Sequence, residues 1–315
     1  MTAGAALTPR NPGAFPDWRF ETVEIEYDEE AQAVWMNYKA DAPPCFTPQT
    51  LEDMAATRKS LQDLFAGGLT ERWPIRYFVI GSNKPGVYGL GGDLATFAAA
   101  IRDKDFDALL AYAHVCVDLI HSLCQGLDLP IVTLSAVHGQ CLGGAFEAAL
   151  ASDFILAEET ANFGVPEVAF NTFPGMGAVS LLTRRLGSAL AQSIISEGRV
   201  YSGRELYDLD AIDALAPDGD IRRATRNWML SDGANHWLRR RAIAEARRQC
   251  FPTTRAEFMR ITELWAECSC HIDDRDLRYM ERLVVAQRRL HNTTRVNETA
   301  NGSPAGLRRS IKDAI

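Results

Sequence analysis

The segment GGAFEAAL, residues 143–150, places two glycines at the start of a helix-favouring stretch that holds a single carboxylate, Glu147. A second carboxylate, Glu167 in FGVPEVAF (163–170), has equally apolar neighbours 20 residues further along the chain. Apolar surroundings raise the pKa of a carboxyl group, and the charge of one acid raises the pKa of the other. The pair predicts a general acid and a general base for adding or removing water next to a carbonyl group, with buried structural salt bridges as the alternative.

Two glycine-rich loops offer backbone donors for the oxygen of such a carbonyl group. The first N–H groups of a helix have no partner inside it, so Gly144 at the start of the predicted helix can receive a developing oxyanion. The loop GLGGD (89–93) can supply a second N–H from another segment. Together they predict an oxyanion hole. Close helix–strand packing is the alternative for Gly143-Gly144, and the spacing in GVYGLGGDL (86–94) excludes a dinucleotide-binding loop.

The composition is that of a globular chain with a large core, with 47% hydrophobic and 23% charged residues among 315. The net charge of −8 argues against a protein that coats nucleic acid or an anionic membrane. Residues 129–146 lack charges but include polar residues and glycines, so no membrane insertion is expected. The N-terminal residues show no signal-peptide pattern, and seven scattered cysteines fit reduced thiols, so we expect a cytoplasmic protein.

Strand and helix patterns alternate through the first two-thirds of the chain, and only helical patterns follow residue 220. Strands are expected at 23–27, 33–38, 75–82, 130–139 and 153–159, with an extended segment at 163–170. Helices are expected at 48–66, 105–125, 143–152 and 175–187. The fold class is therefore α/β with a helical C-terminal extension. The expected units are a flexible arm (1–18), a core (19–219), a helical region (220–292) and a tail (293–315).

Two other clusters have the residue types of a metal site. CSCH (268–271) is one tight cluster with no distant partner pair, and His114, Asp118 and His121 share one face of a predicted helix. A solvated or interface face is the commoner reason for the second pattern. No zinc-protease, nucleophile-elbow or P-loop motif is present, so neither a metal nor a bound cofactor is expected.

The stretch from AVHGQCLGGAFEAAL to FGVPEVAFNTFPGMGA (136–178) resembles the central segment of the crotonase (enoyl-CoA hydratase/isomerase) superfamily. The resemblance runs over about residues 20–290. It implies a spiral of β-β-α repeats with C-terminal helices that pack a trimer. It assigns the oxyanion hole to the N–H groups of Gly92 and Gly144. Glu147 aligns with the glutamate that handles the β-oxygen or water, and Glu167 aligns with the one that moves the α-proton.

Three segments narrow the resemblance to the diffusible signal factor synthases, which make cis-2-unsaturated fatty acid signals for quorum sensing. They are GLGGD (89–93), FGVPEVAFNTFPGMGA (163–178) and the C-terminal stretch 260–289. Ordinary hydratases tend to read SAGAD in place of GLGGD. The resemblance implies dehydration of a 3-hydroxyacyl thioester carried on the phosphopantetheine of acyl carrier protein or on CoA, then hydrolysis to the free acid. It also implies a homotrimer and an inhibitory sensor kinase as a partner. The longer N-terminal arm and the C-terminal tail depart from the family pattern.

Two other functions remain open, an ordinary enoyl-CoA hydratase or isomerase and a catalytically silent scaffold of this fold. The presence of both glutamates counts against the scaffold. Trp265 in the amphipathic C-terminal stretch is expected to line the acyl-tail pocket, with a core or interface position as the alternative. An acidic carrier protein would need a basic patch at the pocket mouth, for which Arg184-Arg185 and the arginines at 239–241 are candidates, with structural salt bridges as the alternative.

Overall fold

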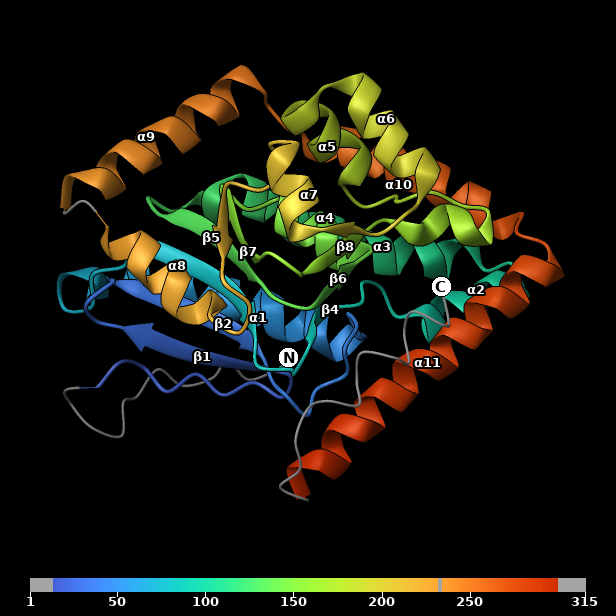
Figure 1. Ribbon diagram of the computed structural model, residues 1–315, viewed down its shortest axis with the longest axis horizontal. Helices are drawn as coiled ribbons and strands as arrows, with labels where there is room; N and C mark the ends of the chain where they lie inside the picture. The colour runs from blue at the N-terminus through green and yellow to red at the C-terminus, as the bar shows by residue number, and fades with distance from the viewer. Residues whose placement is uncertain (1–13, 232–233, 300–315) are drawn as a thin grey trace.

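Two β-sheets form the centre of the protein (Figure 1), whose computed structural model describes residues 14–231 and 234–299. The larger sheet has the strand order β1-β2-β3-β5-β7-β10, and the smaller sheet has the order β4-β6-β8-β9. The larger sheet contains β1 (Val23–Asp28), β2 (Ala33–Tyr38), β3 (Tyr77–Ser82), β5 (Val132–Val137), β7 (Phe154–Glu158) and β10 (Ala214–Ala216). The smaller sheet contains β4 (Val87–Gly89), β6 (Gln140–Leu142), β8 (Asn162–Gly164) and β9 (Tyr201–Ser202).

Most of the larger sheet is parallel and buried on both faces. β1 and β2 form an antiparallel hairpin, whereas the pairings of β2 with β3, β3 with β5, β5 with β7 and β7 with β10 are all parallel. Every residue of β2 and β5 is buried. This burial explains why their sequences read as nearly continuous apolar runs, because covered parallel strands need no polar face.

Three successive turns of the fold, from β3 to η3, each add one strand to each sheet and then a helical segment. β3 and β4 lead into α2 (Leu94–Asp103), β5 and β6 lead into α4 (Gly144–Leu150), and β7 and β8 lead into the 3₁₀ helix η3 (Pro166–Phe170). β4, β6 and β8 pair in parallel, so their carboxyl ends meet at one edge of the smaller sheet. The topology therefore places the loop after Gly89, the Gly143-Gly144 pair and the segment containing Glu167 side by side.

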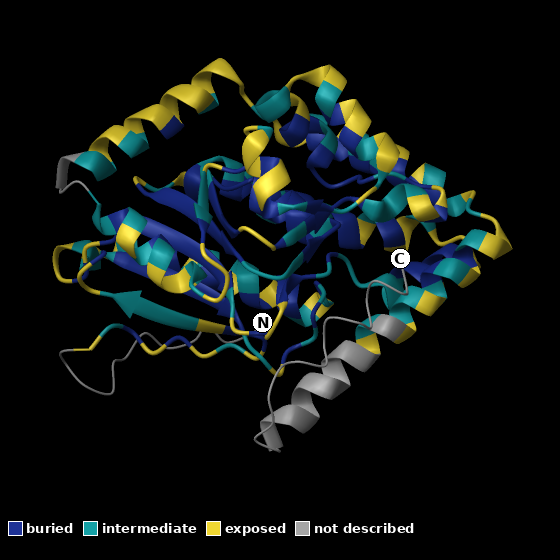
Figure 2. Cartoon of the chain, viewed as in Figure 1, coloured by how far each residue is buried: buried dark blue, intermediate teal, exposed yellow. Residues whose placement is uncertain are grey.

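Helices cover this core, and the C-terminal extension is entirely helical among the described residues. The core helices are α1 (Pro48–Ala66), α2, α3 (Phe106–Cys124), α4, α5 (Ala178–Leu186), α6 (Ser188–Glu197) and α7 (Gly203–Asp208), with 3₁₀ turns η1 (Leu69–Glu71) and η2 (Gly126–Asp128). The extension contains α8 (Ile221–Leu230), α9 (Ala234–Cys250), α10 (Arg255–Cys270) and α11 (Asp274–Thr299). α10 packs along α3, and α11 packs against α2 and η3. The central strands and α4 are buried, whereas β1 at the edge of the larger sheet is half-buried and α9 exposes most of its surface (Figure 2).

The predicted fold class is confirmed, and so are the predicted hairpin and the helix at 48–66. The prediction of an extended segment over 163–170 is wrong beyond β8. Pro166 opens a 3₁₀ helix there, because its fixed φ suits a first helical position. The helix expected from 175 begins only at Ala178, after Gly177, whose φ is 153°.

The described structure also bears on the expected arm and tail. Residues 1–13 and 300–315 lie outside the described residues. Phe15 stacks on Tyr27 with ring centroids 4.8 Å apart, and Trp18 is buried, so the C-terminal end of the expected arm is packed. α11 continues through Thr299, past the expected boundary at 293.

Within the described residues, α3 is the one helix long and apolar enough to span a membrane. Its contacts are those of a core helix, since Leu109, Ala113 and Val117 are buried and it packs on α10, α1 and α2.

Candidate active site

A cavity with about 1100 Å³ of empty space, part of it open to solvent, lies at the edge where β4, β6 and β8 end. All five residues singled out from the sequence line it: Gly92, Gly144, Glu147, Glu167 and Trp265. Most of the remaining lining is apolar. The two glutamates are the only carboxylates in the lining, and no Lys, Arg or His side chain among the described residues lines it.

The amide of Gly92 is oriented by a backbone hydrogen bond on the other side of its peptide group. The N–H of Phe46 donates to the carbonyl of Gly91 at 2.8 Å. That carbonyl and the Gly92 N–H belong to one planar trans peptide, so the N–H points away from Phe46. Gly92 lines the cavity, and its N–H is therefore placed to meet a ligand there.

The amide of Gly144 is oriented in the same way by α4. The carbonyl of Gly143 accepts hydrogen bonds from the N–H groups of Phe146 and Glu147 at 2.9 and 3.1 Å. The N–H of Gly144 in the same peptide therefore points out of the helix start, where α4 supplies no acceptor. An ideal Cβ on Gly144 would lie 3.5 Å from the nitrogen of Gly92, so the two amides are close neighbours.

Glu147 is almost completely buried, with 2% of its surface exposed. Its Oε1 accepts hydrogen bonds from the N–H groups of Met176 and Ala178, both at 3.0 Å, at the start of α5. Burial raises the pKa of the Glu147 carboxyl, and these amide donors partly oppose that change. The sequence FPGMGA thus forms a turn whose amides hold one oxygen of Glu147.

Glu167 lies in the first turn of η3 and has no comparable amide support. Its Oε2 is buried and has no hydrogen-bond partner in the part of the chain that the structure describes. An ideal Cβ on Gly143 would lie 2.9 Å from the Glu167 Oε1, so a glycine is needed where this carboxyl packs. Burial, followed by the charge of Glu147, raises the pKa of Glu167 to about 8.

The surroundings of Glu147 and Glu167 differ in a way that favours one proton shared by the pair near neutral pH. The amide donors at Met176 and Ala178 favour the ionised form of Glu147, whereas a charge on Glu167 is opposed by burial and by Glu147 and is favoured only by its own backbone N–H. These contacts therefore favour the proton on Glu167 and the charge on Glu147. A pair with one proton and one charge has the composition needed for acid–base chemistry.

The raised pKa of Glu167 predicts a pH-dependent effect of its replacement on stability. Above the ordinary value of 4.5 the unfolded chain ionises Glu167, while the folded protein keeps the proton until about pH 8. The free energy of unfolding of the unmodified protein therefore decreases across this window. We expect the melting temperature of Glu167→Gln, relative to the unmodified protein, to increase between pH 5 and pH 9. The exposed Glu52→Gln on α1 is the control, and an equal difference at both pH values would contradict the assignment.

Trp265 is buried and forms part of the cavity wall. Its ring meets the ring of Phe97 edge to face, with centroids 5.2 Å apart. An ideal Cβ on Gly175 would lie 2.3 Å from the Trp265 side chain, so the indole can pack here only because residue 175 has no side chain. Beside this wall, the hydroxyl oxygens of Thr172 and Ser269 lie 3.3 Å apart.

Sequence reasoning missed the contribution of α2 and α11 to the cavity. Phe97 and Ile101 of α2 line it, as do Tyr279, Met280 and Leu283 of α11. An ion pair between Arg102 and Glu281 joins these two helices. The amphipathic pattern of 274–287 indicates a helix with one buried face. Nothing in that pattern identifies the surface that this face covers.

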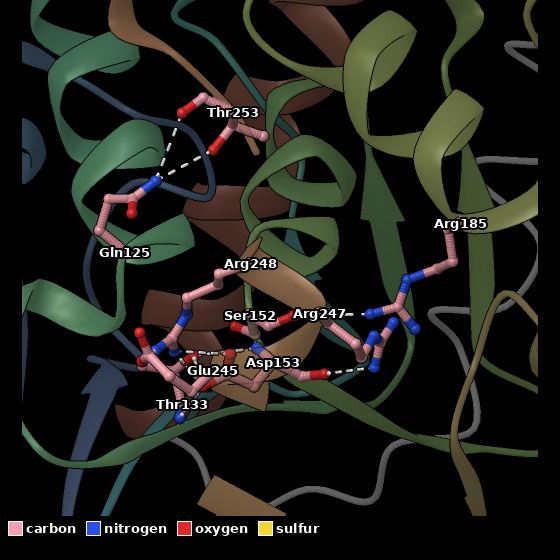
Figure 3. Close-up of polar contacts among 9 residues, drawn as sticks. All are labelled: Gln125, Thr133, Ser152, Asp153, Arg185, Glu245, Arg247, Arg248 and Thr253. Atoms are coloured by element: carbon pink, nitrogen blue, oxygen red, sulfur yellow. Dashed lines mark hydrogen bonds and ion pairs between the residues drawn. The ribbon is translucent and has the colours of Figure 1, made fainter. Parts of the chain in front are cut away.

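Arg184 and Arg185 do not form a patch at the cavity mouth. Arg184 donates two hydrogen bonds to the carboxylate of Glu257, at 2.7 and 2.6 Å. Arg185 pairs with Asp213 at 2.9 Å and points toward the carbonyl of Ser152, within a polar cluster away from the cavity (Figure 3). The alternative of structural salt bridges is correct for both residues.

Two of the arginines at 239–241, Arg240 and Arg241, pack on tryptophan rings. The guanidinium of Arg240 lies 3.6 Å from the ring centroid of Trp228, and that of Arg241 lies 5.7 Å from the ring centroid of Trp237. Because neither arginine cluster lines the cavity, the prediction that one of them marks its mouth is wrong.

The two clusters considered for a metal have other contacts, and in CSCH both Cys268 and His271 contact backbone carbonyls, those of Asn171 and Glu267. Asp118 pairs with Arg255, and the His121 ring lies 6.2 Å from the ring of Phe258. Among the described residues, no three His, Cys, Asp or Glu side chains are grouped as metal ligands would be.

Comparisons with known proteins agree with this architecture. The enoyl-CoA hydratase/isomerase family model matches residues 58–250. The peroxisomal fatty acid beta-oxidation multifunctional protein AIM1 of Arabidopsis thaliana is 33% identical over 152 residues, which are 48% of this chain and 20% of that protein. The fatty acid oxidation complex subunit alpha of Vibrio cholerae is 29% identical over 196 residues, which are 62% of this chain and 26% of that protein. The chain thus spans about a fifth to a quarter of these curated relatives.

Solved structures show the same fold at low sequence identity. Enoyl-CoA hydratase from Bacillus anthracis has a TM-score of 0.60 at 20% identity, over 81% of this chain and 93% of that one. DspI from Pseudomonas aeruginosa has a TM-score of 0.60 at 19% identity, over 79% and 94%. Human mitochondrial delta3-delta2-enoyl-CoA isomerase has a TM-score of 0.62 at 20% identity, over 84% and 98%.

Proposed function

Because this chain belongs to the enoyl-CoA hydratase/isomerase family, we propose that its cavity removes water from a 3-hydroxyacyl thioester and then hydrolyses the thioester. The observation that carries the proposal is the grouping of two carboxyls and two glycine amides in one otherwise apolar cavity. The product is a free cis-2-unsaturated fatty acid, as the resemblance to the diffusible signal factor synthases implies. Glu147, Glu167, Gly92 and Gly144 are the proposed catalytic groups.

The dehydration step uses the two glutamates in opposite roles. The thioester carbonyl oxygen accepts hydrogen bonds from the N–H groups of Gly92 and Gly144, which stabilise the enolate. The ionised Glu167 takes the α-proton, and the protonated Glu147 gives its proton to the departing β-hydroxyl, which leaves as water. This step needs the single proton of the pair on Glu147 rather than on Glu167, so the proton moves from Glu167 to Glu147 as the substrate binds, with no change in the net charge of the pair.

The hydrolytic step returns the pair to its starting state. After dehydration Glu147 is ionised beside the water that has just formed, and Glu167 is protonated. Glu147 takes a proton from water as the water oxygen attacks the thioester carbonyl. The carbon–sulfur bond breaks, and Glu167 protonates the leaving thiolate. One pair of carboxyls with one proton therefore completes both reactions.

Mass spectrometry of the products formed from 3-hydroxydodecanoyl carrier protein by the purified protein tests the proposal. We expect free cis-2-dodecenoic acid. Conversion that stops at the 2-enoyl thioester would instead identify an ordinary enoyl-CoA hydratase or isomerase. No conversion of either the carrier-protein or the CoA thioester would favour the silent scaffold.

The wall formed by Trp265 predicts how this substrate range can be changed. Trp265→Ala enlarges the cavity, so we expect preference to shift toward longer acyl chains, by about fourfold in kcat/KM for each added methylene that becomes buried. Phe258→Ala, a buried aromatic change on the same helix outside the cavity lining, is the control. The readout is kcat/KM across a series of acyl lengths. Loss of soluble protein in Trp265→Ala alone would favour a purely structural role.

The partners remain part of the proposal. The thioester is presented by acyl carrier protein or CoA, the chain assembles as a cytoplasmic homotrimer, and an inhibitory sensor kinase binds it. The resemblance supports the carrier, the trimer and the kinase, and the scattered cysteines support the cytoplasmic location. No bound cofactor takes part in the two steps above.

A further inference from the structure

Tyr112 is a buried residue of α3 that lies behind the glycine loop rather than in the cavity lining. Its hydroxyl donates a hydrogen bond to the carbonyl of Phe46 and accepts one from the N–H of Asp93 at 3.2 Å. Burial raises its pKa well above the ordinary value, so the hydroxyl stays protonated and able to donate. One oxygen thus joins two backbone segments that are far apart in the sequence.

These two segments hold the peptide that carries the Gly92 N–H. The N–H of Phe46 donates to the carbonyl of Gly91 at 2.8 Å, which orients the Gly91–Gly92 peptide from one side. The Asp93 N–H belongs to the next peptide, so the Tyr112 hydroxyl fixes the chain immediately after Gly92. Tyr112 also bonds the carbonyl of Phe46, the residue whose N–H orients the first peptide. The Gly92 amide is therefore held on both sides, and Tyr112 contributes to both.

We propose that Tyr112 is a positioning residue that holds the Gly92 N–H at the angle required by a developing oxyanion. This inference rests on the proposed function, in which Gly92 supplies one of the two donors. Donors fixed in advance need no reorganisation when charge develops on the substrate. A loop without the hydroxyl bridge can still bind a thioester but holds the enolate less well.

The ring of Tyr112 has a separate packing role that the test must preserve. It meets the ring of Phe97 edge to face, with centroids 4.9 Å apart. An ideal Cβ on Gly92 would lie 2.6 Å from the Phe97 ring, so this aromatic pair covers the loop. Tyr112→Phe removes only the hydroxyl and leaves the aromatic contacts in place.

The experiment compares Tyr112→Phe with Tyr27→Phe in the full chain. The hydroxyl of Tyr27 also donates to a backbone carbonyl, that of Pro74 at 2.9 Å, but Tyr27 lies on β1 outside the cavity lining. With 3-hydroxydodecanoyl carrier protein, we expect kcat to fall about tenfold in Tyr112→Phe with KM within about twofold of the unmodified value. Tyr27→Phe should leave both constants unchanged.

Amide hydrogen exchange provides a readout that does not depend on catalysis. We expect faster exchange at Phe46 and Leu90 in Tyr112→Phe than in Tyr27→Phe, because their N–H groups join the two segments that the Tyr112 hydroxyl bridges. An unchanged kcat, or a rise in KM with no change in kcat, would overturn the proposal. If the unmodified protein converts no thioester, the proposed function fails, and equal exchange at Phe46 and Leu90 in the two variants would separately overturn the positioning role.

Discussion

Glu147→Gln and Glu167→Gln should each reduce the rate of dehydration by about 10²-fold or more while the protein remains folded. Glutamine has nearly the shape of glutamate but neither takes nor gives a proton at neutral pH. At position 147 its oxygen can still accept from the N–H groups of Met176 and Ala178, so the turn before α5 is retained. The loss of rate therefore reports proton transfer rather than packing.

The two variants should differ in the partial reaction that survives. Glu167→Gln removes the base for the α-proton, so exchange of that hydrogen with deuterium oxide should stop. Glu147→Gln blocks departure of the hydroxyl but leaves that base, so α-exchange should continue. Glu158→Gln, at a buried glutamate of β7 outside the cavity lining, is the matched control. Near-normal turnover by both folded site variants would show that the acid–base assignment is wrong.

The sequence predicts which glutamates and glycines come together better than it predicts which helices form the wall of the cavity around them. That Glu147 and Glu167 share one site can be predicted because two acids within apolar segments are unusual, and the neighbouring glycines mark places where backbone must approach closely. These signals are local. β4, β6 and β8 then bring the segments together, since parallel strands align the loops that follow them.

Other features depend on partners that the sequence does not identify. Arg184 and Arg185 read as a basic patch, but their carboxylate partners are Glu257 and Asp213, which lie 73 and 28 residues away in the chain. The helical period of α11 reveals an apolar face without showing that the face covers the cavity. The 3₁₀ turn at Pro166 is too short to produce a period at all.

Gly91→Ala should abolish most of the activity through the backbone, without touching either glutamate. Gly91 has a φ of 80°, and an ideal Cβ there would lie 2.7 Å from the nitrogen of Gly144 and 2.8 Å from the carbonyl oxygen of Leu142. Both contacts are with backbone atoms, which cannot rotate out of the way as a flexible side chain can. The methyl group must therefore push the two loops apart and displace the Gly144 amide. Loss of one oxyanion donor lowers kcat by about 10²- to 10³-fold.

The effect of the clash can be separated from the effect of the backbone angle by a second glycine. Gly219 has a φ of 79°, and an ideal Cβ there has no atom within 4 Å. Alanine at either position carries the same left-handed strain, about 1–2 kcal/mol, but only Gly91→Ala adds a collision at the loops. We expect Gly219→Ala to lose a few degrees of melting temperature and keep its kcat, and Gly91→Ala to lose kcat by at least about 10²-fold. Equal kcat values for the two variants would mean that the contact between the Gly91 and Gly144 loops does not hold the oxyanion donors.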